Sequence, residues 1–176
     1  MRIAITGHTR GIGQALANEY TARGHKIIGL SLSQGYNINE PWSLVPIIEQ
    51  CDVFINNAQD GFAQTQLLFD VWEKWQNNPA KKIINIGAKM SQEPLTTVPG
   101  IWMTKYRVYK TTMDEAVKQL RHQAPFPKII TVRPGGVKTE SQPHGVEASI
   151  WAQRLVNILE NQEGTQVLDI TLTSDY

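Results

Sequence analysis

Two side chains with the spacing needed for proton transfer are Tyr106 and Lys110, in the segment YRVYK. Residues four positions apart lie on one face of a helix, so this spacing places both groups together. A nearby ammonium favours the phenolate and lowers the pKa of a tyrosine from its ordinary value of about 10. Tyr109 has no such partner, because Met113 stands four positions after it. We predict that Tyr106 is a general acid/base and that Lys110 lowers its pKa; the alternative is a solvated helix face.

A glycine-rich turn has a pattern suited to binding phosphate. Gly7, Gly11 and Gly13 follow the apolar run RIAI and lead into a segment of helical periodicity. Residues without a Cβ atom let the backbone approach a ligand closely, and the free N–H groups at a helix start carry partial positive charge. The turn therefore predicts a site for the pyrophosphate of a dinucleotide; the alternative is a tight turn without a ligand. His8, within the turn, is expected to point to solvent.

Apolar runs rich in Ile and Val recur along the chain and do not alternate with polar residues. They are RIAIT, KIIGL, DVFIN, KIINIG, KIITVR and VLDITL, at residues 2–6, 26–30, 52–56, 82–87, 128–133 and 167–172. Such runs are typical of strands buried on both faces of a parallel sheet. Between them lie stretches of helical periodicity, the first from Ile12 to Arg23. We predict an α/β fold: a single doubly wound Rossmann-type domain over residues 1–176, with a mainly parallel sheet of six or seven strands flanked by helices.

The composition argues against several other classes of protein. Seventeen basic and sixteen acidic side chains leave a net charge of +1, so no long-range field would gather nucleic acid. No apolar run approaches the roughly 18 residues of a membrane span. The histidines, Cys51 and the carboxylates lack the spacing of metal ligands, so no metal site is predicted. A single cysteine excludes an intramolecular disulfide and favours a cytoplasmic location.

Five short motifs are spread over nearly the whole chain. They are TGHTRGIG at residues 6–13, DVFINNA at 52–58, YRVYK at 106–110, RPGGVKT at 133–139 and GTQVLDI at 164–170. In the same order they resemble the TGxxxGIG, DxxxNNAG, YxxxK and PGxVxT motifs and the final strand of the short-chain dehydrogenase/reductase family. The resemblance implies an NAD(P)-dependent oxidoreductase that transfers hydride between its cofactor and a small-molecule carbonyl or secondary alcohol. It also implies a homodimer or homotetramer, formed by helices that carry Trp72, Trp75 or the face of Tyr106.

The resemblance also implies a set of cofactor contacts. These residues are Gly7, Thr9, Arg10, Gly11, Ile12, Gly13, Ser31, Asn37, Ile38, Asn57, Ala58, Tyr106, Lys110, Pro134, Gly135, Val137 and Thr139. In the family the lysine hydrogen-bonds the nicotinamide ribose, which implies the same contact for Lys110. The loop of residues 133–139 is implied to contact the nicotinamide end.

The chain departs from the family's pattern in the active-site region. The serine that holds the substrate oxygen in the family falls at Ala88, so Ser91 is the nearest replacement and our third candidate catalytic residue. The alternative is that Ser91 is only a polar loop residue. The asparagine that supports the lysine has no identifiable counterpart, although Gln64 and Gln66 begin the helix that should carry it. Gln59 replaces the usual glycine after Asn-Asn-Ala.

The end of the second expected strand bears on the choice of cofactor. NAD selectivity normally needs an acidic residue there, whose carboxylate accepts hydrogen bonds from the ribose. The segment KIIGLSLSQ offers Ser31 and Ser33 and no acid, and Arg10 resembles the basic position of members that use NADP. A guanidinium can pair with the 2′-phosphate, so NADP(H) is favoured over NAD(H). Asn37 is expected to contact the adenine, with Ile38 beside it.

Two interpretations of the function remain. The first is an NADP-dependent oxidoreductase of short-chain dehydrogenase/reductase type, which the intact Tyr106 and Lys110 favour. The second is an NADP-binding sensor or partner protein on the same fold, with little or no turnover, which Ala88 and Gln59 favour.

Overall fold

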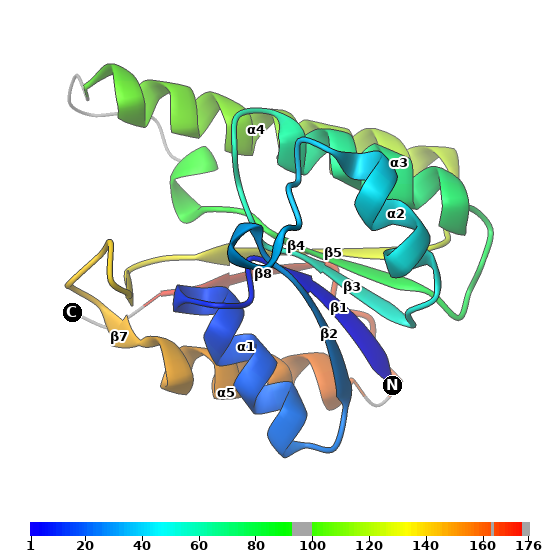
Figure 1. Ribbon diagram of the computed structural model, residues 1–176, viewed down its shortest axis with the longest axis horizontal. Coiled ribbons are helices and arrows are strands. Elements are labelled where there is room, and N and C mark those ends of the chain that lie inside the picture. The colour runs from blue at the N-terminus through cyan, green and yellow to red at the C-terminus, as the bar shows by residue number, and fades with distance from the viewer. Residues whose placement is uncertain (93–99, 163, 174–176) are drawn as a thin grey trace.

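The computed structural model describes residues 1–92, 100–162 and 164–173, which form an α/β structure around a main sheet of six strands (Figure 1). The strands are β1 (Arg2–Thr6), β2 (Lys26–Leu30), β3 (Val53–Asn56), β4 (Lys82–Ile86), β5 (Lys128–Pro134), β6 (Val137–Lys138), β7 (Val146–Glu147) and β8 (Asp169–Leu172). The helices are α1 (Gly11–Ala22), α2 (Pro41–Glu49), α3 (Ala63–Trp75), α4 (Ile101–Gln123) and α5 (Ala148–Glu160), with short 3₁₀ turns η1 (Leu32–Gln34) and η2 (Lys89–Ser91).

The main sheet has the strand order β2-β1-β3-β4-β5-β8, and every neighbouring pair in it is parallel. The central strands β1, β3, β4 and β5 are buried along most of their length. This burial explains why their sequences are continuous apolar runs, since helices cover both faces of the sheet. β6 and β7 pair with each other apart from it. The predicted fold class, a mainly parallel sheet flanked by helices, is confirmed.

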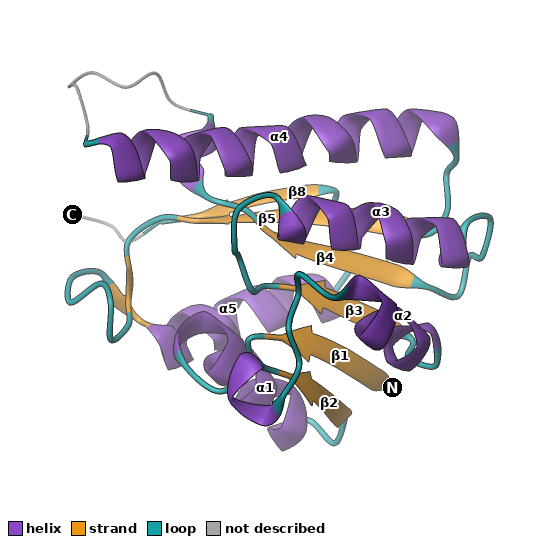
Figure 2. Ribbon diagram, turned by 45° about the horizontal axis from the view of Figure 1, so that its top comes forward, coloured by secondary structure: helices purple, strands orange, loops and turns teal. Residues whose placement is uncertain are grey.

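The helices are divided between the two faces of the sheet. α1 and α5 pack side by side on one face, and α2, α3 and α4 cover the other (Figure 2). Trp72 and Trp75 of α3 lie in the hydrophobic core of the second face, with only 4% and 1% of their surface exposed. These two side chains pack within the chain, and the expectation that the helix that carries them takes part in a subunit contact stays a prediction. No helix among the described residues is long and apolar enough to cross a membrane.

The strand order reverses direction between β1 and β3. From β1 the chain crosses to β2 on one side, and it then returns to β3 on the other side of β1. At such a point the loops that follow neighbouring strands diverge, and a crevice opens at the carboxyl ends of the strands. The glycine turn follows β1 directly, so the topology places it in this crevice.

Candidate active site

A cleft of about 970 Å³ lies where β1, β2 and β3 end. The predicted residues that line it are Gly7, Thr9, Arg10, Gly11, Ile12, Ser31, Asn37, Ile38, Asn57, Ala58 and Thr139. Residues that the sequence did not single out as cofactor contacts also line it, namely Leu30, Leu32, Ser33, Tyr36, Gln59, Asp60, Glu140 and Ser141. The predicted residues Gly13, Tyr106, Lys110, Pro134, Gly135 and Val137 lie outside this lining.

The glycine turn has the geometry of an anion cradle. Gly7 and Gly11 have φ angles of +67° and +54°, a backbone region that residues with a Cβ atom rarely adopt. Arg10, at the N-cap of α1, makes no side-chain capping bond, and its guanidinium has no acceptor atom that could take up the N–H groups of the first turn. These donors and the helix dipole favour a phosphate at this place. The residues present therefore fit the pyrophosphate of a dinucleotide.

Gly13 acts through packing and not through the cleft. A Cβ atom on it would lie 2.2 Å from the main-chain oxygen of Gly7 and 2.6 Å from Asn57 Nδ2. Only glycine lets α1 approach the turn this closely. Gly13 is buried and lies outside the cleft lining, and its expected contact with the cofactor stays a prediction.

Hydrogen bonds fix the glycine turn to the neighbouring strands. Thr6 Oγ1 accepts the main-chain N–H groups of Asn57 and Ala58 at 2.9 and 3.0 Å, and Asn57 Nδ2 donates to the Thr6 carbonyl at 2.9 Å. On the other side, His8 Nδ1 lies 2.9 Å from Ser31 Oγ. The His8 ring occupies the space that a Cβ atom on Gly29 would fill. His8 is thus half-buried against β2, contrary to the expectation that it points to solvent, and burial lowers its pKa.

The end of the cleft beside β2 combines a cation with hydroxyl groups. Ser33 Oγ donates to Thr9 Oγ1 at 3.4 Å, which brings the loop after β2 against the residue that precedes Arg10. Across the cleft, Asn39 Nδ2 donates to Asp60 Oδ2 at 2.7 Å and links the loops that follow β2 and β3. This end can therefore hold an adenosine group, with donors for a ribose phosphate on one side.

Lys110 is held at the carboxyl edge of the sheet by a buried amide. Its Nζ donates to Gln64 Oε1 at 2.8 Å and to the main-chain oxygen of Ile86 at 2.9 Å. Gln64, near the start of α3, donates in turn to the main-chain oxygens of Asn56 and Ile86 at 2.7 and 3.1 Å. Asn56 and Ile86 end β3 and β4. Gln64 thus supports Lys110 directly, a role that the sequence left unassigned between Gln64 and Gln66.

Tyr106 and Lys110 share one face of α4, as their spacing predicts. Lys110 Nζ lies 5.6 Å from the centroid of the Tyr106 ring. Burial raises the pKa of Tyr106. Burial also lowers the pKa of Lys110 to about 7, against the opposing charge of Asp114. Burial is thus the cause of the Tyr106 shift, and the expected lowering of its pKa by Lys110 is not seen in this structure.

Ser91 belongs to a buried ion-pair network. Its Oγ lies 2.5 Å from Asp114 Oδ2 and 2.8 Å from the carbonyl oxygen of Ala88. Arg133 Nη2 pairs with Asp114 Oδ1 at 3.0 Å, and Arg133 Nη1 pairs with Asp169 at 2.9 Å. Ser91, Asp114 and Arg133 are at most 8% exposed. The hydroxyl is occupied in joining η2 to α4, so these contacts do not support a substrate-positioning role for it.

The loop after β5 reaches the cleft only at its far end. Thr139 lines the cleft, whereas the Gly135 N–H donates to the carbonyl of Leu172 and so holds β8. Val137 is 4% exposed and packs in the core beneath α5. Pro134 pairs with Leu172 in the sheet. None of Pro134, Gly135 and Val137 lines the cleft, and their expected contacts with the cofactor stay predictions.

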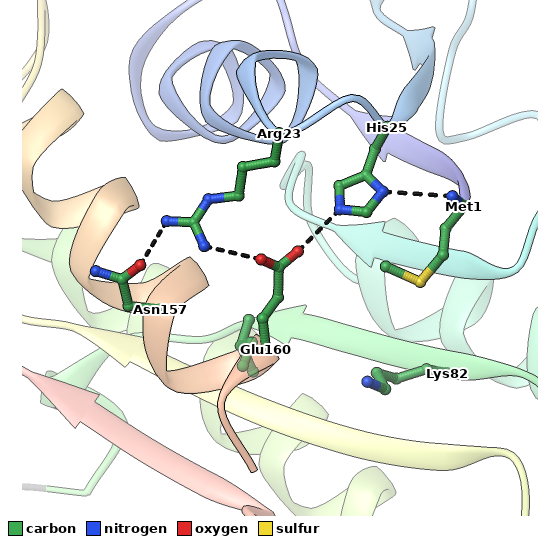
Figure 3. Close-up of a pocket in the computed structure, with 7 residues that line it drawn as sticks. Met1, Arg23, His25, Lys82, Asn157 and Glu160 are labelled. Carbon is green, nitrogen blue, oxygen red and sulfur yellow. Dashed lines mark hydrogen bonds and ion pairs between the residues drawn. The ribbon is translucent and has the colours of Figure 1, made fainter. Parts of the chain in front are cut away.

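A separate hollow of about 660 Å³ lies at the amino-terminal edge of the sheet (Figure 3). Arg23 and His25 both contact Glu160, at 2.8 and 2.9 Å, and Arg23 also donates to Asn157. Lys82 lies beside them. These ion pairs form a structural clamp, because they join the end of α1 and the start of β2 to the end of α5. None of the predicted site residues lines the hollow.

No group of three His, Cys, Asp or Glu residues suited to a metal ion occurs in the described parts of the chain.

Solved structures with a similar fold include short-chain dehydrogenases/reductases. An alcohol dehydrogenase from the archaeon Thermococcus sibiricus, complexed with 5-hydroxy-NADP, has a TM-score of 0.78 and 16% identity over 100% of this chain and 97% of that chain. A short-chain dehydrogenase/reductase from Vibrio parahaemolyticus gives 0.77 and 20%, over 99% and 100%. A short-chain dehydrogenase from Burkholderia cenocepacia J2315 in complex with NADP gives 0.74 and 16%, over 98% and 96%. No protein-family model matches the sequence, and no curated protein matches it either. The likeness shows that the chain has the fold of this family.

Proposed function

We propose that this chain is an NADP(H)-dependent oxidoreductase that interconverts a small-molecule carbonyl and a secondary alcohol. The observation that carries the proposal is the fixed position of Lys110, whose Nζ lies 5.6 Å from the centroid of the Tyr106 ring and bonds to Gln64 and to the end of β4. Similar structures include enzymes complexed with NADP and with NADH, which supports a nicotinamide cofactor.

The residues of the chain have distinct roles in this proposal. When bound, the nicotinamide would supply or accept the hydride. Tyr106 donates the proton to the carbonyl oxygen, and burial keeps its phenol protonated at neutral pH, which suits the reductive direction. Lys110 holds the ribose through its ammonium, whose charge is lost as the pH rises through about 7. The turn of Gly7 and Gly11 holds the pyrophosphate.

A preference for NADP(H) is supported by the charges at the β2 end of the cleft. Arg10, Ser31 and Ser33 line it there, and no acidic residue follows β2 where a carboxylate would repel a 2′-phosphate. Charge-assisted hydrogen bonds from a guanidinium are among the stronger polar contacts.

A second candidate function is NADP binding with little or no turnover. Ala88 offers no hydroxyl where the family has its serine, and the Ser91 hydroxyl is bound to Asp114. Loss of one oxygen-positioning donor costs on the order of 10²-fold in rate in other enzymes. A sensor or partner protein on this fold would bind NADP in the cleft without catalysing hydride transfer.

We also propose that two copies of the chain pair through α4. A groove of about 650 Å³ between α3 and α4 has a mainly apolar lining that includes Phe69 and Val108. Arg107 and Glu115 also line it, at equal distances in sequence from Thr111. A two-fold axis at Thr111 would place Arg107 of each copy opposite Glu115 of the other.

Thermal-shift titration with NADPH, NADP, NADH and NAD tests the cofactor proposal. We expect stabilisation by all four and the largest shift with NADPH. Replacement Arg10→Glu should weaken NADPH binding by about 10- to 100-fold, because it removes a charge-assisted contact, with NADH binding in the same variant as the control. Absence of stabilisation by any of the four nucleotides would remove the basis for the cleft assignment.

A further inference from the structure

Trp102 is an exposed aromatic residue in the first turn of α4. Its side chain is 67% exposed, although an indole ordinarily gains by burial. Its ring stacks on that of Tyr106, with centroids 5.7 Å apart and planes inclined by 9°. Trp102 lies four residues before Tyr106, and Lys110 lies four residues after it. The reactive tyrosine therefore has an aromatic neighbour one turn before it and a cationic neighbour one turn after it.

We infer that Trp102 is a positioning residue that covers the ring of Tyr106 and fixes its orientation for proton transfer. This inference rests on the proposed function, in which Tyr106 supplies the proton. A parallel stack restricts rotation of the phenol ring and excludes water from the covered face. The rate of proton transfer depends strongly on the orientation of the donor, because small displacements of a reacting group reduce rates steeply.

The charged groups near Tyr106 do not explain its raised pKa. Lys110 is the cation recorded over its ring, and Lys105 and Arg107 flank it on α4. On η2, which packs against α4, Lys89 is the charged residue. Burial is the cause that raises the pKa of Tyr106. Cover of the ring by neighbouring side chains is thus the dominant influence, and Trp102 is the aromatic group stacked on it.

The variants Trp102→Ala and Trp102→Phe test the inference, with Ile101→Ala as the matched control. Ile101 is 72% exposed and adjacent in sequence, so its removal takes away a similar exposed side chain without the stack. Two quantities are measured: NADPH-dependent reduction with its pH profile, and titration of the Tyr106 phenol by ultraviolet absorbance. Subtracting the spectrum of the same variant with Tyr106→Phe isolates Tyr106 from the other tyrosines.

For Trp102→Ala we expect kcat to fall by roughly threefold to tenfold with an unchanged KM for NADPH. The Tyr106 titration should move to lower pH, because water reaches the ring. Trp102→Phe should restore most of both values, and Ile101→Ala should change neither. An unchanged phenol titration in Trp102→Ala, or equal effects of Trp102→Ala and Ile101→Ala, overturns the inference.

Other results would overturn the proposed function: no binding of any nucleotide, or full turnover by Tyr106→Phe. In either case the phenol titration still decides whether Trp102 covers Tyr106, because it needs no catalysis.

Discussion

At the scale of single residues, the site depends on amides that the sequence pattern does not identify. Gln64 accepts a hydrogen bond from Lys110 and donates to the ends of β3 and β4. Gln66, two residues later, is exposed and donates to Asp70 on the same helix. The two side chains have the same chemistry. Gln64 is buried and Gln66 is exposed because of the way in which α3 faces the sheet, which the sequence does not specify.

We predict that Gln64→Leu lowers both activity and stability. The change removes three buried hydrogen bonds, from Lys110 to Gln64 and from Gln64 to the main-chain oxygens of Asn56 and Ile86, while the bond from Lys110 to Ile86 remains. A buried polar group left unpaired costs about 1–3 kcal/mol in unfolding free energy. We expect a loss of kcat of about tenfold or more and a lower melting temperature. Gln66→Leu is the matched control and should change neither strongly. Equal effects of the two substitutions on kcat would argue against support of Lys110 by Gln64.

The sequence predicts the residues of the cleft better than those of the proton-transfer site. Thr9, Arg10 and Asn57 follow strand ends, where the topology alone decides that they meet. Ser91 and Asp114 are 23 positions apart and come together only because η2 folds against α4. An aspartate four residues after Lys110 was the available signal, since that spacing places it on the same helix face.

At the scale of elements, α1, β2 and α5 are joined by the clamp in Figure 3. Glu160, at the end of α5, pairs with Arg23 at the end of α1 and with His25 before β2. Burial disfavours the carboxylate, but hydrogen bonds with Arg23 and His25 outweigh this and lower the pKa of Glu160. The strands themselves can be predicted from the sequence, because they are continuous apolar runs. The long-range contact of Glu160 with Arg23 and His25 cannot be predicted in this way.

The lowered pKa of Glu160 predicts how the clamp responds to pH. Its folded-state pKa lies below the ordinary value of 4.5, so its contribution is complete above that value and is lost as the pH falls through the folded-state pKa. We expect Glu160→Gln to lower the free energy of unfolding by about 1 kcal/mol at neutral pH, with a smaller difference in acid. Urea unfolding at several pH values measures this, with the exposed Glu73→Gln as the control. A difference that grows as the pH falls would contradict the sign.

At the scale of the whole molecule, the strand order gathers three loops at one crevice, and the groove of the proposed dimer lies between α3 and α4. We predict that Arg107→Glu dissociates the proposed dimer, because it places Glu115 of each copy against a second carboxylate. The double variant Arg107→Glu/Glu115→Arg should restore pairing with the charges exchanged. Multi-angle light scattering reports the mass. A monomeric wild-type chain, or a dimer that Arg107→Glu leaves unchanged, would refute this interface.

The central claim is that Tyr106 transfers the proton while NADPH is oxidised. The most direct measurement is the rate of NADPH oxidation with a panel of ketones and aldehydes, for the wild type, Tyr106→Phe and the neighbouring Tyr109→Phe. We predict turnover of some carbonyl substrate by the wild type and Tyr109→Phe. The Tyr106→Phe variant should lose about 100-fold or more of the rate while still binding NADPH. Undiminished turnover by Tyr106→Phe, or NADPH binding without oxidation by the wild type across the panel, would contradict the claim.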